Sequence, residues 1–359
     1  MLVNHQKIDT SAVFGSVDVE LTDQLTFQGS ARYTWEERAF EGCIRDAGDG
    51  SLGSVFGLLA TILSGSPQTL GPGECVTLNS AFKSTLVRDT LEEENLSWRG
   101  SLNWEPTADL LVYASLTRGY KAGNFSTIPG LTPEQFDPLR QESILAYEAG
   151  FKATLVDRTL QLNAAVFYYD YQDKQLLGSI QNPVFGTLPG SVAIPESTVT
   201  GWEADIVWQP VEALRVVGGV SHVDSEIETD PPLPIDPYGT LTTFVGERFP
   251  YTPEWQATVD AEYRFPVASG LQAYVGGTVT YRSSSYSNFG ENEAFILEER
   301  NLIDLRAGVE AENGAWRVQV FGRNVTDEVY SIQTSRLTDT VLRYTGMPVT
   351  YGVQLSVRH

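Results

Sequence analysis

The 359-residue chain has no long apolar run, few histidines and cysteines, and little positive charge. No stretch approaches the roughly eighteen consecutive apolar residues that a membrane-spanning helix needs, which excludes helical membrane spans. Lys and Arg number 24 against 46 Asp and Glu, and the net charge is -22. This charge argues against nucleic-acid binding, because phosphates are recognised through a basic surface.

The chain also lacks the residue clusters of a catalytic or metal site. Its three histidines, His5, His222 and His359, are far apart and have no cysteine or carboxylate at ligand spacing. No nucleophile elbow, phosphate-binding loop or metal-binding pair is recognisable. The sequence therefore predicts a protein that is not an enzyme and that binds no metal and no cofactor.

Apolar and polar residues alternate along most of the chain, which indicates β-strands with one apolar and one polar face. Near the C-terminus, Ile303, Leu305 and Ala307 alternate with Asp304 and Arg306, and an Asn-Gly turn at 313–314 separates this segment from the next. Thirteen such segments are recognisable from residue 13 onward. Short turns follow the odd-numbered segments and long loops follow the even-numbered ones. We therefore predict an all-β transmembrane antiparallel β-barrel, whose short turns are periplasmic and whose long loops are extracellular.

Both cysteines, Cys43 and Cys75, fall in the longest predicted loop, which spans residues 40–91 and is expected to be extracellular. At an oxidising cell surface they could form one disulfide bond that closes this loop. Two unpaired thiols are the alternative, because the sequence does not give the separation of the two Cα atoms.

Five stretches resemble, in order, the C-terminal barrel of TonB-dependent outer-membrane receptors: residues 113–125, 147–152, 163–171, 201–205 and 322–330. The resemblance covers essentially the whole chain, which we interpret as one partial barrel domain at 1–359. It implies a barrel of about 22 strands that is closed by an N-terminal plug domain, with this chain supplying roughly strands ten to twenty-two.

The ends of the chain depart from that family. No plug, no TonB-contacting segment and no secretory signal precede Ser11, so we expect the chain to be a fragment or an incomplete reading frame. An odd-numbered open sheet would leave two strand edges unpaired in lipid. Barrels of this family normally end in an aromatic residue, whereas this chain ends in His359.

Strand direction places six residues in the loops or in the upper lumen, where they are candidates for substrate contact. Aromatic and basic groups there could stack on, or pair with, a chelate or a sugar. Anchoring at the membrane interface and loop packing are equally good explanations for each of them. The candidates are Lys121, Asn124, Tyr169, Tyr171, Arg282 and Tyr286.

The resemblance implies a receptor in the outer membrane of a Gram-negative bacterium that takes up a scarce nutrient by TonB-dependent active transport. A ferric chelate is the favoured substrate, and cobalamin, haem and saccharides are further candidates, although the acidic loops disfavour a highly anionic siderophore. The expected partners are outer-membrane lipid, the small-molecule nutrient and, through a missing plug, the TonB complex. The alternatives are a passive porin-like diffusion channel and a soluble all-β binding module. Charges of both signs on the polar faces suit cross-strand pairs and plug contacts better than an ion-selective porin.

Overall fold

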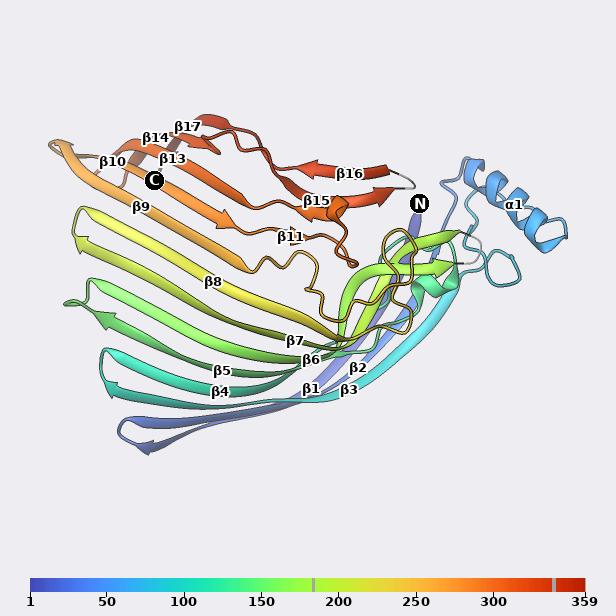
Figure 1. Ribbon diagram of the computed structural model, residues 1–359, viewed down its shortest axis with the longest axis horizontal. Helices are drawn as coiled ribbons and strands as arrows, with labels where there is room; N and C mark the ends of the chain where they lie inside the picture. The colour runs from blue at the N-terminus through green and yellow to red at the C-terminus, as the bar shows by residue number, and fades with distance from the viewer. Residues whose placement is uncertain (183–184, 338–339, 359) are drawn as a thin grey trace.

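The computed structural model describes residues 1–182, 185–337 and 340–358, so His359 lies outside the described residues. Within that part of the chain, thirteen strands form one antiparallel sheet in chain order (Figure 1). This sheet confirms the predicted fold class and the predicted number of strands. The strands are β1 (Leu2–Thr22), β2 (Leu25–Ile44), β3 (Val87–Thr107), β4 (Leu110–Lys121), β5 (Glu142–Leu155), β6 (Leu160–Asn182), β7 (Gly186–Val211), β8 (Leu214–Thr229), β9 (Trp255–Ala268), β10 (Leu271–Arg282), β13 (Arg300–Ala311), β14 (Trp316–Arg323) and β17 (Thr350–Val357).

Short turns and long loops lie at opposite ends of the sheet, as the sequence predicts. The short turns, of which β1–β2 and β3–β4 are the first two, lie at the left of Figure 1, and the long loops lie at the right. At the β13–β14 turn, Gly314 has a φ of 71°, the left-handed conformation that an Asn-Gly hairpin turn uses. We refer below to the turn end and the loop end of the sheet.

One face of the sheet is apolar and exposed. On β17, Tyr351, Val353 and Leu355 leave 71%, 73% and 67% of their surface uncovered. The intervening Gly352 and Gln354 belong to the opposite, polar face, because successive residues of a strand alternate between faces. Exposure of so many apolar side chains to water is unfavourable by about 25 cal/mol per Å². Acyl chains remove that cost, so the apolar face is the one that meets lipid.

The long loops contain short elements that alternation did not reveal. They are α1 (Ser51–Ser64), two 3-10 helices, η1 (Pro133–Phe136) and η2 (Glu293–Phe295), and two small hairpins, β11 (Ser285–Tyr286) with β12 (Ile296–Leu297) and β15 (Ser331–Leu337) with β16 (Thr340–Thr345). The loop predicted at 40–91 is shorter in the structure, since β2 continues to Ile44 and β3 begins at Val87. Beyond the lipid both faces of a strand meet water, so alternation no longer marks its ends. Among the described residues, no helix combines the length and apolarity needed to cross a bilayer.

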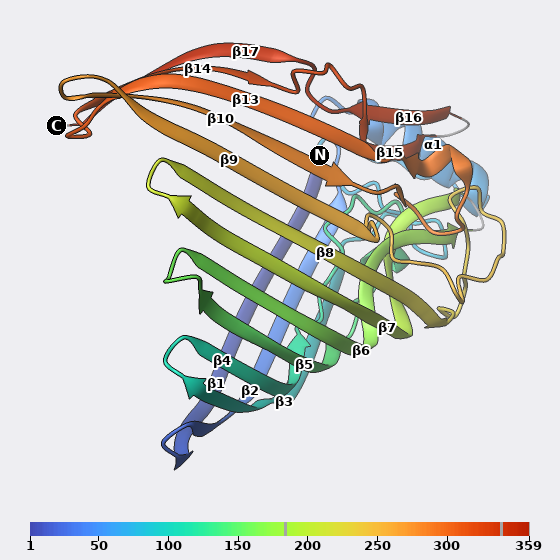
Figure 2. The same cartoon turned by 60° about the vertical axis from the view of Figure 1, so that its left-hand side comes forward.

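The β6–β7 hairpin extends far beyond its neighbours and curves at the loop end (Figure 2). Asp173 on β6 has a φ of 52° and lies between the cross-strand pairs Gln172–Glu196 and Lys174–Ile194. Pro195 of β7 stands opposite and has no amide hydrogen for the strand ladder. This local break in regular pairing allows the hairpin to curve and to pack against neighbouring loops.

Candidate ligand-binding site at the loop end of the sheet

The loop end has an apolar core of its own. Side chains from β7, β8 and the loops 230–254 and 283–299 are buried together, and Phe167, Tyr169 and Tyr171 of β6 pack against them. This core fixes two long loops against the wall of the sheet. Its buried members are Ile194, Val199, Ile227, Phe244, Phe249 and Phe289.

Three aromatic rings follow one another along the polar face of β6. Phe167 stacks on Tyr169 with ring centres 4.8 Å apart, and Tyr169 meets Tyr171 edge-on at 6.4 Å. Their spacing of two residues keeps all three on one side of the strand. We call Phe167, Tyr169 and Tyr171 the aromatic ladder, since it leads from the core of the loop end down the wall.

Glu142 joins two lysines beside the ladder. Its side chain is nearly buried, and its carboxylate lies 3.5 Å from Nζ of Lys121 and 3.3 Å from Nζ of Lys174. It also accepts a hydrogen bond from the amide of Gln175 at 2.9 Å, and the side chain of Gln175 accepts one from Nδ2 of Asn124 at 2.6 Å. Two of the predicted residues, Lys121 and Asn124, thus belong to one hydrogen-bonded network.

Lys174 connects this network to the aromatic ladder. Its ammonium group lies 4.0 Å from the ring centre of Tyr171 and 5.2 Å from that of Phe249. A cation over the face of an aromatic ring is attracted by the ring quadrupole. The face of Tyr171 is therefore covered by a side chain of the protein itself.

The other two predicted residues meet at the segment that follows Phe249. Nη2 of Arg282 donates to the carbonyl oxygen of Tyr251 at 3.1 Å, and the amide of Tyr251 donates to the carbonyl oxygen of Tyr286 at 2.7 Å. Tyr251 has a φ of 61°, a left-handed conformation that is uncommon for a non-glycine residue. The segment 249–251 thus joins the Lys174 network to Arg282 and Tyr286.

The structure consequently brings the six predicted residues into one region through protein contacts. Lys121 keeps 56% of its side chain exposed, whereas Asn124 and the ring face of Tyr171 are already engaged. Their role in substrate contact stays a prediction. Sequence reasoning missed Glu142, Lys174 and Phe249. Glu142 could have been found, because it is the cross-strand partner of Lys121 in the β4–β5 pair.

The connection between β2 and β3 is tied down at its base. Cys43 and Cys75 form a disulfide bond, with their Cα atoms 5.8 Å apart. Beside it, the nearly buried carboxylate of Asp46 accepts four backbone hydrogen bonds. These bonds hold the pKa of Asp46 well below its usual range, and the bond from Gly53 has the largest effect. The four donors are the amides of Gly48, Gly50, Gly53 and Gly73, at 2.7, 3.0, 3.0 and 3.2 Å.

The polar face nearer the turn end carries a network of paired charges. Arg306 donates to both carboxylate oxygens of Asp260 at 2.6 and 2.9 Å, and its Nε donates to Glu262 at 2.9 Å. Arg264 bonds Glu262 and Glu310 in turn. Asp260, Glu262 and Arg264 lie on β9, and Arg306 and Glu310 lie on β13, so these pairs reach across the intervening strand β10. The charges neutralise one another, so this part of the wall is held together by the protein's own ion pairs.

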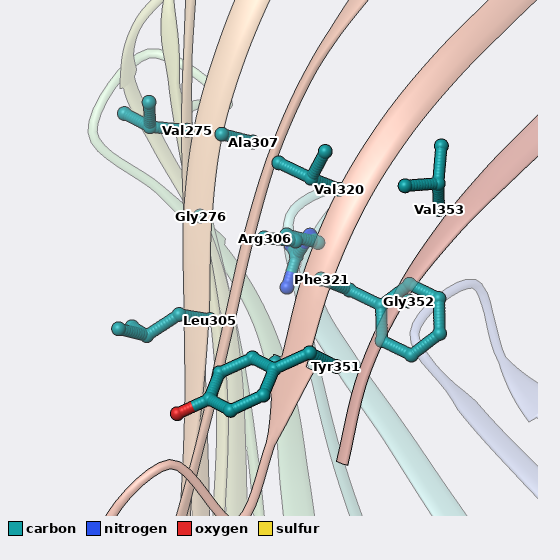
Figure 3. Close-up of a pocket in the computed structure, with 11 residues that line it drawn as sticks. Val275, Gly276, Leu305, Arg306, Ala307, Val320, Phe321, Tyr351, Gly352 and Val353 are labelled. Carbon is teal, nitrogen blue, oxygen red and sulfur yellow. The ribbon is translucent and has the colours of Figure 1, made fainter.

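A depression of about 720 Å³ opens elsewhere, on the apolar face. Val275, Ala307, Val320 and Val353 follow one another across β10, β13, β14 and β17, with Leu305 and Tyr351 beside them (Figure 3). A ligand site normally combines an apolar wall with a few convergent polar groups. Most side chains that line this depression belong to the lipid-facing band, and Arg306 is the only charged one among the lining residues, so we assign the ligand site to the loop end.

A sheet with one lipid-facing face, one charged face, short turns at one end and long loops at the other defines the wall of a transmembrane β-barrel. The family described as "TonB dependent receptor-like, beta-barrel" matches residues 2–325 of the chain. The chain belongs to this family, as the resemblance of its sequence motifs implied.

Known relatives share the fold at low sequence identity. The ferric yersiniabactin uptake receptor FyuA from Yersinia pestis superposes with a TM-score of 0.73 at 18% identity, over 99% of this chain and 46% of that one. The closed form of the ferric-catecholate import receptor Fiu from E. coli K12 gives 0.68 at 17% identity, over 98% and 45%. The metal-pseudopaline receptor CntO of Pseudomonas aeruginosa is 24% identical over 152 residues, which are 42% of this chain and 20% of that protein. The chain therefore spans less than half the length of these relatives.

Proposed function

We propose that this chain forms part of an outer-membrane receptor that takes up a ferric chelate by TonB-dependent active transport. The observation that carries the proposal is the loop end, where the aromatic ladder, Lys121 and Arg282 lie in one region above a charged wall. Aromatic rings and cations are suited to a compact chelate with aromatic or anionic parts. The relatives named above are receptors for ferric or metal chelates, which supports the same substrate class.

In this proposal the receptor moves its substrate and makes or breaks no covalent bond. The loop end binds the chelate, and the charged polar face contacts a plug that gates the passage. The TonB complex of the inner membrane acts on that plug and supplies the energy. The plug and the TonB complex are included in the proposal because the chain belongs to the TonB-dependent receptor family.

Uptake of a radiolabelled ferric chelate tests the proposal. The full-length receptor is expressed in a Gram-negative strain that lacks its own ferric-chelate receptors, with and without a functional TonB complex. We expect uptake only when both the receptor and the TonB complex are present. Uptake that persists without TonB, together with passage of unrelated small solutes, would indicate a porin-like channel instead.

A pair of neighbouring variants tests the aromatic ladder. Tyr169 lies on the polar face, whereas Tyr168, the adjacent residue, lies on the apolar face and is 43% exposed. Tyr169→Leu should weaken chelate binding about tenfold, the effect of losing one aromatic contact. Tyr168→Leu is the matched control and should leave binding unchanged. Equal effects of the two variants would remove the ladder from the proposed site.

A further inference from the structure

Two arginines stand directly opposite each other near the loop end of the polar face. Arg282 ends β10 and Arg300 begins β13, and the two residues are cross-strand partners. Thr278 and Arg306 both bond Asp260 and so mark the polar face of β10 and β13. Arg282 is four residues from Thr278, and Arg300 is six from Arg306, so both arginines lie on that same face. Opposite residues have Cβ atoms about 5 Å apart, and like charges in this position are destabilising. A group of opposite charge between the two arginines would therefore be stabilising.

No carboxylate of the described residues supplies that compensation. Arg282 and Arg300 form no ion pair there, whereas Arg264, Arg306 and Arg317 on the same face each lie within 4.0 Å of a Glu or Asp oxygen. Three acids lie near Arg300 in the sequence or at its loop. Glu298 pairs with Arg343, and the carboxylate of Glu328 accepts the amide hydrogen of Asn301. Glu299, the residue before Arg300, is exposed and forms no ion pair with either arginine in the described part of the chain.

The two guanidinium groups are held in place while most of their donors stay free. Arg282 donates to the carbonyl oxygen of Tyr251 at 3.1 Å, and Arg300 donates to the carbonyl oxygen of Ser331 at 3.2 Å. The guanidinium carbon of Arg300 also lies 4.7 Å from the ring centre of Tyr330. An arginine has five N–H donors. Among the described residues, Nε of Arg282 is enclosed and has no acceptor.

We propose that Arg282 and Arg300 together bind an oxyanion, such as a carboxylate, of the transported chelate. This inference rests on the proposed function and names the chemistry of its substrate: the chelate carries at least one anionic oxygen group. Guanidinium forks suit this group because they bind two oxygens of one anion at once. The acidic loops do not contradict the proposal, since an arginine pair acts at contact distance, whereas exposed charges are screened beyond about 10 Å.

Chemical protection tests the site without knowledge of the natural substrate. The full-length receptor in detergent is treated with phenylglyoxal, which modifies solvent-accessible arginines, and the modified positions are mapped by mass spectrometry. We expect citrate or inorganic phosphate to reduce modification of Arg282 and Arg300, relative to chloride at the same ionic strength. Arg158, which is 74% exposed at the turn end, should react equally with and without these anions. Absence of selective protection would overturn the proposal. This result is also expected if another part of the receptor already supplies a carboxylate to the two arginines, and in that case too the proposal is wrong.

Binding and transport of two chelates by the receptor and its variants test the link to the substrate. Ferric citrate provides carboxylates, and a neutral ferric trihydroxamate provides none. Arg282→Gln and Arg300→Gln should each weaken binding of ferric citrate about ten- to a hundredfold, the effect of losing hydrogen bonds to a charged group, and should leave the neutral chelate unaffected. Arg343→Gln removes the same charge from the same end of the sheet and is the matched control. Equal losses for both chelates, or for the control, would overturn the proposal. A wild-type receptor that transports no chelate would contradict the proposed function alone, since the protection experiment tests the anion site separately.

Discussion

Replacement of Arg306 by Gln should destabilise the receptor wall markedly. Arg306 makes three short hydrogen bonds to two carboxylates, Asp260 and Glu262, and its side chain is only 21% exposed. The exposed fractions of the two acids are 28% and 14%. Gln cannot reproduce the planar fork that binds both oxygens of Asp260. Asp260 would then lose its ion-pair partner, whereas Glu262 would keep its pair with Arg264.

The expected cost follows from this partial burial. An exposed ion pair contributes about 0–1 kcal/mol, whereas loss of one partner from a buried pair costs about 3–5 kcal/mol. Arg306 lies between these limits, and we expect a loss of about 2–3 kcal/mol. The matched control is Arg158→Gln, since Arg158 is 74% exposed and bonds Asp109 alone, which predicts a loss below about 1 kcal/mol.

Urea unfolding of the full-length receptor in lipid vesicles measures both losses, with tryptophan fluorescence as the signal. The double variant Arg306→Gln with Asp260→Asn should recover part of the loss, because it removes the unpaired charge together with its partner. If Arg306→Gln costs no more than Arg158→Gln, water in the lumen screens the network and the reasoning from partial burial is wrong.

Three further predictions concern the loops. Asp46→Asn should increase hydrogen exchange throughout residues 45–86, because an amide cannot accept on both sides as the carboxylate does, while Asp49→Asn in the same loop should have little effect. Cys43→Ser should lower the free energy of local unfolding of this loop by about 3–4 kcal/mol at most, the chain-entropy value for a disulfide that closes about 30 residues, and limited proteolysis should show faster cleavage there. Burial raises the pKa of Glu247 to about 7 from its ordinary 4.5, so the native state holds an extra proton between these values. Docking of Glu247 on the amide of Gly290, 2.8 Å away, should therefore weaken as pH rises from 4.5 to 7 and change little above that range, which pH-dependent hydrogen exchange of Gly290, corrected for its intrinsic rate, would show.

The sequence predicts the sheet well because lipid imposes a strict pattern on it. Ile303, Leu305 and Ala307 must all face the bilayer, so their alternation with polar residues is visible without any alignment. That constraint ends at the lipid boundary. For this reason the pattern predicted neither the last residues of β2 nor helix α1. The contacts of Lys174 with Tyr171 were missed for a different reason: they depend on the curvature of the hairpin at Asp173, and no local pattern encodes that curvature.

The motif at 322–330 shows why resemblance identifies the family without naming a substrate. Asn324 is buried and has a φ of 48°. Its Nδ2 donates to the carbonyl oxygens of Glu328 and Met347 at 2.9 and 3.2 Å, and its Oδ1 accepts the amide hydrogen of Glu328 at 2.9 Å. The motif thus fixes the chain where β14 ends and the loop begins. A residue with this task is required by the fold whatever the receptor transports.

The arginines of the polar face fall into two groups, those that pair with carboxylates and those that do not. Arg264 on β9 and Arg306 on β13 reach carboxylates across the intervening strand β10, and Arg317 on β14 lies close to Glu310 on the neighbouring β13. The strand register brings these groups together on one face. The same register places Arg282 opposite Arg300, where a carboxylate in either position would have been stabilising. Two arginines opposite each other, in a chain with a net charge of -22, cannot be explained by a general excess of cations. A ligand that supplies the missing anion would offset their cost to stability. This difference is the reason to propose the anion site at the loop end and to attribute the paired charges to the wall.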